Sequence, residues 1–248
     1  IGQNHMMQTL ALIAMEDPGG LDGNAIRNAR ANVLKALLPI KPRNLAKRVT
    51  LGQYRGFTGG PEVPKSSKTE TYFKIRASIG NKRWKGVPVT LEAGKALKED
   101  CKKIVITFKE RPTCVCHVHD SVYLQNVLEF HIAPHEGISL KFWAKKKGFT
   151  MDVEPRELSF TYRTPDDKMH PHDAYEQLLF DAVRGEQTLF ASTDEVRAAW
   201  KFITPILEHW STIPLKTYER GSSGPKTERH GVLACPPGVP IHRMSADG

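Results

Sequence analysis

The sequence predicts an α+β fold: one large, mostly antiparallel sheet with helices on one of its faces. Two observations support this prediction. Apolar residues recur every three or four positions near both ends of the chain, which is typical of helices, and they alternate with polar residues between about residues 73 and 142, which is typical of half-buried strands. With 248 residues, the chain is long enough for one large domain or two small ones.

Two helices are expected in the first forty residues. The apolar stripes place them at residues 3–15 and 23–38, and a proline follows closely after each, which favours helix termination. Residues 40–70 are rich in Pro, Gly, Lys and Ser. They are expected to form a long connection with one short strand near residues 49–54.

Four runs of alternating residues follow, and their apolar members are expected to share the covered face of the sheet. These members are Phe73, Ile75, Ala77 and Ile79; Ile104, Ile106 and Phe108; Val122, Leu124, Leu128, Phe130 and Ile132; and Ile138, Leu140 and Phe142. An antiparallel sheet with one covered and one solvated face requires this pattern.

Helices return near the carboxyl end of the chain. One is expected on the stripe Ala174, Leu178 and Ala182, with Leu179 and Val183 beside it. The next begins at a capping box formed by Ser192 and Glu195. Its expected core face consists of Val196, Trp200, Ile203, Leu207 and Trp210. Residues 1–225 are expected to form one domain, and residues 226–248, rich in Gly, Pro and charges, a loose tail.

The charge balance is basic. The chain has 36 Lys and Arg against 27 Asp and Glu, a net charge of +9, which suits nucleic acid, an anionic membrane surface or small anionic substrates. Its one tight basic run, Lys145–Lys147, is either a solvated edge or a phosphate contact. No stretch approaches the ~20 apolar residues of a membrane span, and no signal-peptide pattern is present. A cytoplasmic protein that binds no membrane is therefore expected.

The sequence gives little support for a metal site or for a nucleotide-binding site. In the segment Cys114, Cys116, His117 and His119, the cysteines are spaced more tightly than in common zinc sites, and strand alternation would place them opposite the histidines. A reduced loop is therefore favoured over a zinc site, and no metal is expected. No glycine-rich loop follows a predicted strand, so the sequence contains no dinucleotide-binding fingerprint.

Six blocks of the sequence resemble, in order and with matching spacing, the carboxy-terminal half of glucose-6-phosphate dehydrogenases. The blocks are residues 2–16, with the triplet QNH; 49–54, with GQY; 84–97, with WKGVP and AGKAL; 134–141, with EGISLK; 174–190, with AYE and GEQTLF; and 194–207. One block could arise by chance, but six in order could not. The chain is identified as a member of this family over roughly residues 2–225.

The resemblance implies the oxidation of glucose 6-phosphate to 6-phosphogluconolactone with hydride transfer to NADP, the first step of the oxidative pentose phosphate pathway. Hydride leaves C1 only when the C1 hydroxyl loses its proton, so a base must lie within hydrogen-bond reach of it. The family's base matches His5, and an imidazole with a reference pKa of about 6.5 suits the role. Without the family register, a lone histidine on a helix would more often be surface or core filler.

The family lysine that donates to the sugar phosphate matches Lys95. A compact ammonium suits a dianionic phosphate, and Gly94 before it is expected to leave room for close approach of the substrate. Without the family register, a lone lysine at a strand end would most often be solvated.

The resemblance also implies a first half that this sequence does not contain. In the family, the nucleotide-binding fold that holds NADP and the carboxylate that orients the histidine both precede the residue that matches Ile1. The helix expected at residues 3–15 begins without a lead-in, which suggests a fragment. The chain alone is therefore expected to be catalytically inactive.

Several positions depart from the family pattern. Asp100 stands where the family often has a basic residue facing the phosphate, Glu92 replaces the usual arginine before the GK pair, and Ala133 replaces a glutamine. Animal members hold a second, structural NADP on this domain, but the basic positions that bind it match Glu92, Cys101 and Val105 here. No structural NADP is therefore expected.

Two other functions and one assembly follow from the same observations. The chain could be a non-catalytic partner or regulator on the same scaffold, or a polyanion-binding module that uses its net charge. No interleaving of aromatic and basic residues supports the polyanion module, so no nucleic-acid partner is expected. The family dimerises through the polar face of the sheet, so a symmetric homodimer is expected.

Asp100 provides the first test. In a completed enzyme, with a nucleotide-binding half joined before Ile1, Asp100→Arg is expected to lower the KM for glucose 6-phosphate and to leave kcat nearly unchanged. A phosphate contact remote from C1 contributes largely uniform binding, which acts on KM. Steady-state kinetics of the two proteins would measure the change, and an unchanged KM would show that Asp100 does not face the phosphate.

Overall fold

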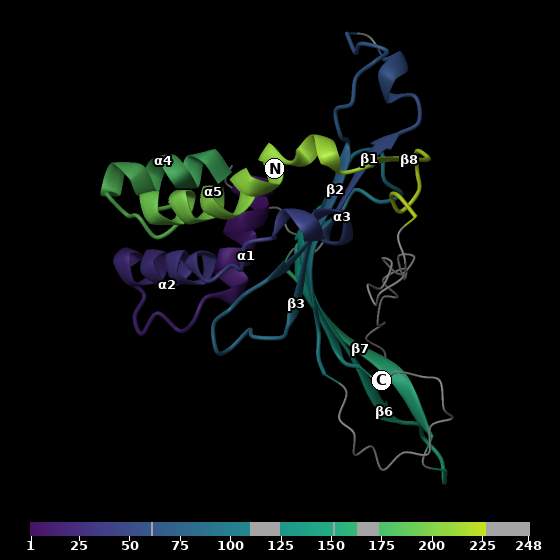
Figure 1. Cartoon of the computed structure of the whole chain (residues 1–248). Helices are drawn as coiled ribbons and strands as arrows, with labels where there is room; N and C mark the ends of the chain where they lie inside the picture. The colour runs from purple at the N-terminus through teal and green to yellow at the C-terminus, as the bar shows by residue number, and fades with distance from the viewer. Residues whose placement is uncertain (61, 110–124, 151, 163–173, 227–248) are drawn as a thin grey trace. The chain divides into compact units, whose positions relative to one another are not determined.

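The computed structural model describes residues 1–60, 62–109, 125–150, 152–162 and 174–226. The chain forms two compact units, the first from residues 1–98 and 172 onward and the second from residues 99–171. Each unit contains one four-stranded sheet (Figure 1). The predicted α+β class with antiparallel sheets is confirmed. Its strands, however, are divided between two sheets where one was expected, because alternation identifies a strand without determining its neighbours.

All helices expected in the first unit are present, and short helical segments also occur between residues 42 and 59, where a long connection was expected. They are η1 (Gly2–Met6), α1 (Met7–Ala14), α2 (Gly23–Lys35), η2 (Pro42–Asn44), α3 (Leu45–Arg48), η3 (Phe57–Gly59), α4 (Ala174–Arg184), α5 (Thr193–Glu208) and η4 (Trp210–Thr212). Asp22 caps α2 by accepting from the backbone N–H of Ala25. The capping box predicted from Ser192 and Glu195 begins α5. Both caps satisfy backbone donors that a helix start leaves unpaired.

The sheet of the first unit has the strand order β3-β2-β1-β8. Its strands are β1 (Val49–Tyr54), β2 (Tyr72–Ser78), β3 (Pro88–Gly94) and β8 (Leu215–Tyr218). β2 pairs antiparallel with β1 and β3, whereas β8 pairs parallel with β1. Ile75 lies opposite Val49 on one side and Leu91 on the other, and all three are buried in the main core. The predicted core residues of this strand are thus confirmed at Ile75 and Ala77, and Phe73 packs partly buried beside them.

The core lies between this sheet and the packed helices α1, α2 and α5 (Figure 1). On α1, Leu10 is buried. The predicted core face of α5 is wrong at Val196, Trp200 and Leu207, which are exposed, and confirmed at Ile203, which is buried. Its last member, Trp210, lies beyond the end of the helix and packs partly buried against the core. The residues that α5 buries are Ala198, Ala199, Phe202, Ile203 and Ile206. Apolar residues cover more than half of this helix, and the small alanines allow its closest approach to the core.

The helix α4 also differs from its prediction. Leu178 is half-buried, but Leu179, Ala182 and Val183 of the expected stripe are exposed. The buried side chain on this helix is Asp181, which accepts a hydrogen bond from Gln177 at 2.9 Å. The apolar stripe of α4 was correctly identified as an amphipathic face but lies outside the core of the unit.

The second unit contains the antiparallel sheet β4-β5-β6-β7. Its strands are β4 (Lys102–Thr107), β5 (Val127–Ala133), β6 (Gly137–Lys145) and β7 (Val153–Thr161). Its register aligns apolar residues in rows across one face: Ile104, Phe130, Ile138 and Phe160, and next to them Ile106, Leu128, Leu140 and Leu158. The opposite face is polar, with Glu129 buried beside Lys103, Lys141 and His131. The alternation predicted for β4, β5 and β6 is confirmed, but the expectation that its apolar members share a covered face is wrong here. Phe108 and Ile132 are exposed, and the buried residues Val127, Glu129 and Ser139 lie on the opposite face.

Some expectations fall outside the described residues. They are the candidate ligands Cys114, Cys116, His117 and His119, the strand residues Val122 and Leu124, and the expected tail except for Lys226. Within the described ranges, no three His, Cys, Asp or Glu side chains are placed to share a metal ion. No helix in the same ranges has the length and apolar character needed to cross a membrane.

A buried ion pair joins α2 to the start of α5. Arg30 Nε lies 3.1 Å from Glu195 Oε2, and only 7% of the arginine side chain and none of the glutamate side chain is exposed. This contact lacks the alignment of a hydrogen bond, but Arg30 also donates to Glu195 Oε1 at 3.3 Å and to the Phe190 carbonyl at 2.8 Å. Glu195 thereby combines the capping of α5 with the docking of α2.

The ion pair of Arg30 with Glu195 leads to a prediction about stability, and the neighbouring residue Asp194 provides the control. Glu195→Ala is expected to lower the free energy of unfolding by about 3–5 kcal/mol, because it leaves Arg30 charged and buried without its partner. Asp194→Ala removes the exposed pair with Lys35, which joins the same two helices at 2.5 Å, and should cost far less. Urea unfolding of both variants would measure the difference, and equal losses would contradict the prediction.

Candidate functional site

A pocket of about 350 Å³ opens in the first unit where η1, the end of β3 and α5 meet. Its walls are mainly apolar and include Phe73, Trp200, Ile203, Leu207 and Trp210. The polar lining comes from Gln3, Glu70, Thr71 and Lys95. A largely apolar hollow with a few converging polar groups is the usual form of a small-molecule site.

Lys95 lines this pocket at the end of β3. Its backbone N–H donates to the Thr71 carbonyl at 2.8 Å. The side chain is exposed, and among the described residues no carboxylate forms an ion pair with its ammonium. The predicted phosphate ligand is therefore held at the main chain and has its charge available for an anion.

The structure shows a packing constraint at Gly94, in addition to the expected room for the substrate. A Cβ atom at this position would lie 2.7 Å from Cδ2 of Tyr72 and 3.0 Å from Cδ1 of Leu97. These contacts are too short for any side chain, so glycine is needed for internal packing of the strand end. Gly94 still lines the pocket, but room for a substrate is not the constraint that the structure shows.

His5 lies on η1, two residues after the pocket residue Gln3, and is itself exposed without lining the pocket. The element η1 is a single π-helical turn, in which the N–H of Met6 donates to the carbonyl of Ile1 at 3.2 Å. Such widened turns recur at functional sites because they change the direction of the side chains they carry. Among the described residues, none forms a hydrogen bond with the His5 ring.

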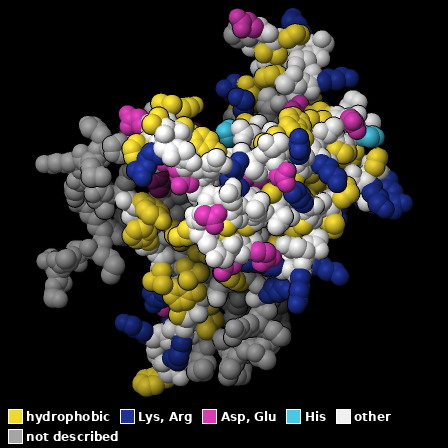
Figure 2. All heavy atoms as spheres, turned by 90° about the vertical axis from the view of Figure 1, so that its left-hand side faces the viewer, with side chains coloured by type: hydrophobic (Ala, Val, Ile, Leu, Met, Phe, Trp, Pro, Cys, Tyr) yellow, Lys and Arg dark blue, Asp and Glu magenta, His cyan; other side chains and the backbone are white. Residues whose placement is uncertain are grey.

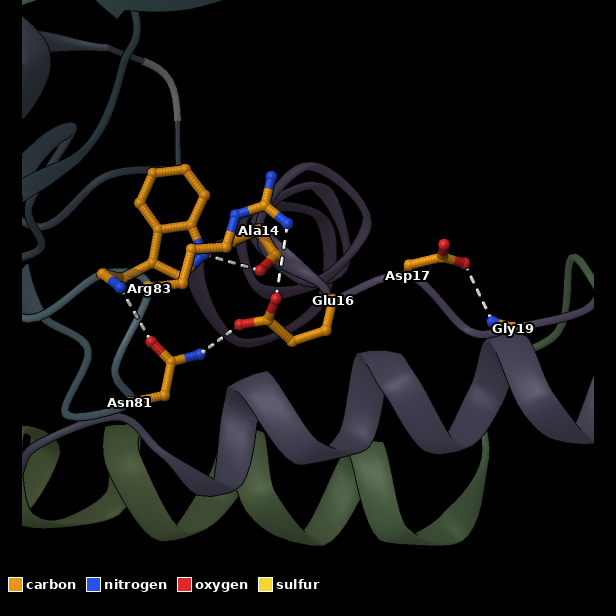
Figure 3. Close-up of polar contacts among 7 residues, drawn as sticks. Ala14, Glu16, Asp17, Gly19, Asn81 and Arg83 are labelled. Carbon is orange, nitrogen blue, oxygen red and sulfur yellow. Dashed lines mark hydrogen bonds and ion pairs between the residues drawn. The ribbon is translucent and has the colours of Figure 1, made fainter.

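The helix that continues from His5 is anchored at its other end to the loop between β2 and β3 (Figure 3). Trp84 donates its indole N–H to the Ala14 carbonyl at 2.7 Å and its backbone N–H to the Asn81 side chain at 3.0 Å. Asn81 and Arg83 both contact the carboxylate of Glu16, at 3.3 and 3.4 Å. The loop that leads into β3 therefore also fixes α1 along its axis, which links the strand of Lys95 to the helix of His5.

Glu92 is occupied on the other face of the sheet. Its carboxylate accepts the Tyr72 hydroxyl at 2.7 Å and pairs with Lys74 at 3.1 Å. Burial, followed by the hydrogen bond and the charge of Glu92, raises the pKa of Tyr72 well above its usual range. The carboxylate that replaces the family arginine is thus engaged with two strand neighbours, and the phenol stays protonated.

Sequence reasoning missed Thr71 and Tyr218, which hold the main chain around Lys95. Tyr218 donates its hydroxyl to the Lys95 carbonyl at 2.7 Å. It lies 123 residues further along the chain. Only the GSSGP segment after it gives a local signal of a fixed turn, and this signal does not indicate the partner.

On the surface that Figure 2 shows, Lys and Arg side chains are scattered and interspersed with Asp and Glu. In the run Lys145–Lys147, the ammonium of Lys145 donates to the carbonyls of Lys146 and Gly148 at 3.0 and 2.6 Å. These observations favour the solvated-edge interpretation of this run over a phosphate contact.

Comparison with known proteins points to one family. The family model for the glucose-6-phosphate dehydrogenase C-terminal domain matches residues 1–233. Glucose-6-phosphate 1-dehydrogenase of Borreliella burgdorferi is 36% identical over 234 residues, which cover 90% of this chain and 48% of that protein. The protein of the same name from Aggregatibacter actinomycetemcomitans is 40% identical over 235 residues, with 90% and 47% covered. The chain spans about half the length of the curated relatives it matches.

Solved structures agree with the sequence comparison. A glucose-6-phosphate dehydrogenase in complex with its substrate glucose-6-phosphate superposes with a TM-score of 0.77 at 33% identity, covering 90% of this chain and 47% of that one. Glucose-6-phosphate 1-dehydrogenase from Mycobacterium avium gives a TM-score of 0.75 at 32% identity, with 91% and 46% covered.

Proposed function

Because the chain belongs to the family of glucose-6-phosphate dehydrogenase C-terminal domains, we propose that it provides the general base and the phosphate-binding lysine for oxidation of glucose 6-phosphate. The observation that carries this proposal is the pocket that η1 and the end of β3 share, since these two elements bear His5 and Lys95. The product is 6-phosphogluconolactone, as in the first step of the oxidative pentose phosphate pathway.

The proposed chemistry divides between the two residues. His5 takes the proton of the C1 hydroxyl while the C1 hydrogen leaves as hydride, so that the C1–O bond becomes the carbonyl of the lactone. Lys95 binds the phosphate at the other end of the sugar and thereby contributes affinity for the substrate. When bound, NADP accepts the hydride, and we assign its binding to the part of the relatives that lies outside the match.

Cofactor and location follow from the same assignment. Among the described residues, no glycine-rich loop leads from a strand into an α-helix, and Glu92, Cys101 and Val105 stand at the positions that are basic where the family binds a structural NADP. We therefore propose no nucleotide site on this chain, including none for a structural NADP. A cytoplasmic location is proposed because one relative, from Arabidopsis thaliana, is named a cytoplasmic glucose-6-phosphate 1-dehydrogenase.

The test uses the 248-residue chain alone and joined to the nucleotide-binding half of a relative. The chain alone is expected to reduce no NADP, because positioning of the hydride acceptor is absent, whereas the joined protein is expected to be active. In the joined protein, His5→Asn should lower kcat by roughly 10²–10⁴-fold, as the loss of a general base does. NADP reduction followed by absorbance measures both quantities.

Lys95→Ala is the matched control, because it should raise KM and change kcat little. A joined protein that is folded but inactive would favour the alternative of a non-catalytic partner on the same scaffold. Activity of the chain alone, or full kcat in His5→Asn, would contradict the proposed roles.

We also propose a symmetric homodimer, formed through the sheet of the second unit. The expected contact was the polar face, but the apolar rows of this sheet give the better surface. Leu158 and Phe160 of β7 are 62% and 58% exposed, and they continue rows of apolar residues across all four strands. Contiguous exposed apolar area of this kind marks association surfaces, and a second copy supplies a matching one.

The dimer is tested with two substitutions at adjacent positions of β7. Phe160→Lys introduces a charge on the apolar face and should raise the dimer dissociation constant by about tenfold or more. Ser159→Lys introduces the same charge on the polar face and should change it little. Sedimentation velocity at micromolar protein concentration measures both. The opposite result would assign the contact to the polar face, and a wild-type monomer would reject the dimer.

A further inference from the structure

The main chain of Lys95 is held on both of its sides. Its N–H donates to the Thr71 carbonyl at 2.8 Å, and its carbonyl accepts the Tyr218 hydroxyl at 2.7 Å. Tyr218 is 4% exposed and ends β8, so this second bond comes from a different edge of the sheet. Lys95 is therefore the point at which the β2–β3 hairpin and the carboxyl-terminal strand are joined.

The conformation of the next residue, Ala96, depends on this connection between the hairpin and the carboxyl-terminal strand. Ala96 has φ +52°, in the left-handed region that residues with a Cβ atom rarely adopt. Its carbonyl accepts the N–H of Gly221 at 2.8 Å, and the N–H of Lys98 donates to the carbonyl of Ser222 at 2.9 Å. An alanine stays in this conformation only where its surroundings determine it. The loop after β8 provides those surroundings.

The donor of each hydrogen bond around Tyr218 can be assigned by counting hydrogens. The phenol oxygen lies 2.7 Å from the Lys95 carbonyl, 3.2 Å from the Thr71 carbonyl and 3.0 Å from Thr71 Oγ1. A phenol has one hydrogen, and the shortest contact places it on the Lys95 carbonyl. The Thr71 hydroxyl is then the donor to Tyr218, while its oxygen accepts the N–H of Tyr54 at 3.0 Å. The hydrogen bonds therefore run in one direction: Thr71 donates to Tyr218, and Tyr218 donates to Lys95.

Water cannot readily replace the phenol in these hydrogen bonds. The Tyr218 ring packs against Tyr72 and Tyr54, with centroids 5.8 and 6.3 Å apart, and Pro225 closes over the adjacent strand. Burial raises the pKa of Tyr218, so its hydroxyl keeps the proton that it donates. Removal of the hydroxyl alone would leave the Lys95 carbonyl without a donor in a space shaped for the ring.

We propose that Tyr218 is a positioning residue: through the Lys95 carbonyl, it sets the direction in which the Lys95 ammonium enters the pocket and so sets affinity for the substrate's phosphate group. This inference rests on the proposed role of Lys95. Tyr218 itself touches no substrate. It acts on binding of the phosphate, and the base His5 lies outside its hydrogen bonds.

The experiment uses Tyr218→Phe, which deletes the hydroxyl and keeps the ring. In the joined enzyme, KM for glucose 6-phosphate should rise about five- to twentyfold, the loss expected for one buried hydrogen bond, with kcat within about twofold. The matched control is Tyr54→Phe, which removes a hydroxyl from the adjoining ring and should leave KM unchanged. Circular dichroism establishes that both variants are folded.

Two further readouts separate positioning from general damage. With glucose, which has no phosphate, kcat/KM should be the same in Tyr218→Phe and wild type, whereas a damaged fold would lower it. In the Lys95→Ala background, Tyr218→Phe should raise KM no further, because the two residues act through one contact. A rise in both backgrounds, or no rise in either, overturns the proposal.

Two further outcomes need tests of their own: a Tyr218→Phe variant that does not fold, and a joined wild-type protein that is inactive. If Tyr218→Phe does not fold, Thr71→Val, which removes the donor to the phenol, should give a smaller rise in KM in the same direction, and no rise rejects the inference. If the wild-type joined protein is inactive, the proposed function fails by itself. The inference is then decided by calorimetric binding of inorganic phosphate to the 248-residue chain, which Tyr218→Phe should weaken and Tyr54→Phe should not.

Discussion

The parallel pairing of β8 with β1 is the constraint on which the first unit depends. It places Leu215 beside Leu51 and Tyr218 beside Tyr54, although more than 160 residues separate the paired strands. Closing so long a loop is entropically unfavourable, but the cost grows only slowly with loop length and is offset by burial of α5 against the sheet. The pairing also explains Gly52, because a Cβ atom there would lie 2.5 Å from the ring of Pro225.

Once β8 is in place, each half of the candidate site is held by its own set of contacts, and the loop between β2 and β3 connects the two halves. The turn with Lys95 is held by Thr71 and Tyr218, which belong to the sheet and its carboxyl-terminal strand. The helix that carries His5 is held at its far end by Trp84 and by the contacts of Glu16. A site that must fix a sugar at two ends benefits from this division, because rigid elements position each group without strain on the other.

The sequence was sufficient for most element types, but not for the surroundings of the proposed site residues. Period and capping signals located α1, α2, α5, β1, β2, β4, β5 and β6, because these signals are local, but β7 and β8 were not predicted. The core face of α5 was wrong at Trp200 and Leu207, since a helix that is apolar over most of its circumference does not reveal which side a neighbour covers. The division into two sheets depends on strand pairing, and the bond from Tyr218 to Lys95 depends on tertiary proximity. Neither leaves a periodic pattern in the sequence.

The basic composition of the chain makes it necessary to ask which lysine can bind a phosphate. Several cations are neutralised internally: Lys74 by Glu92, Lys103 and Lys141 by Glu129, and Arg30 by Glu195. A cation that already has a buried carboxylate partner gains little from a second anion and would lose the first. Other lysines are exposed and do not line the pocket, and ordering such a flexible side chain on a ligand costs conformational entropy. Lys95 differs from both groups, because its backbone is fixed on two sides, its ammonium has no carboxylate partner among the described residues, and it lines a pocket. Net charge brings anions toward the chain, but preorganisation is what makes one position a binding site.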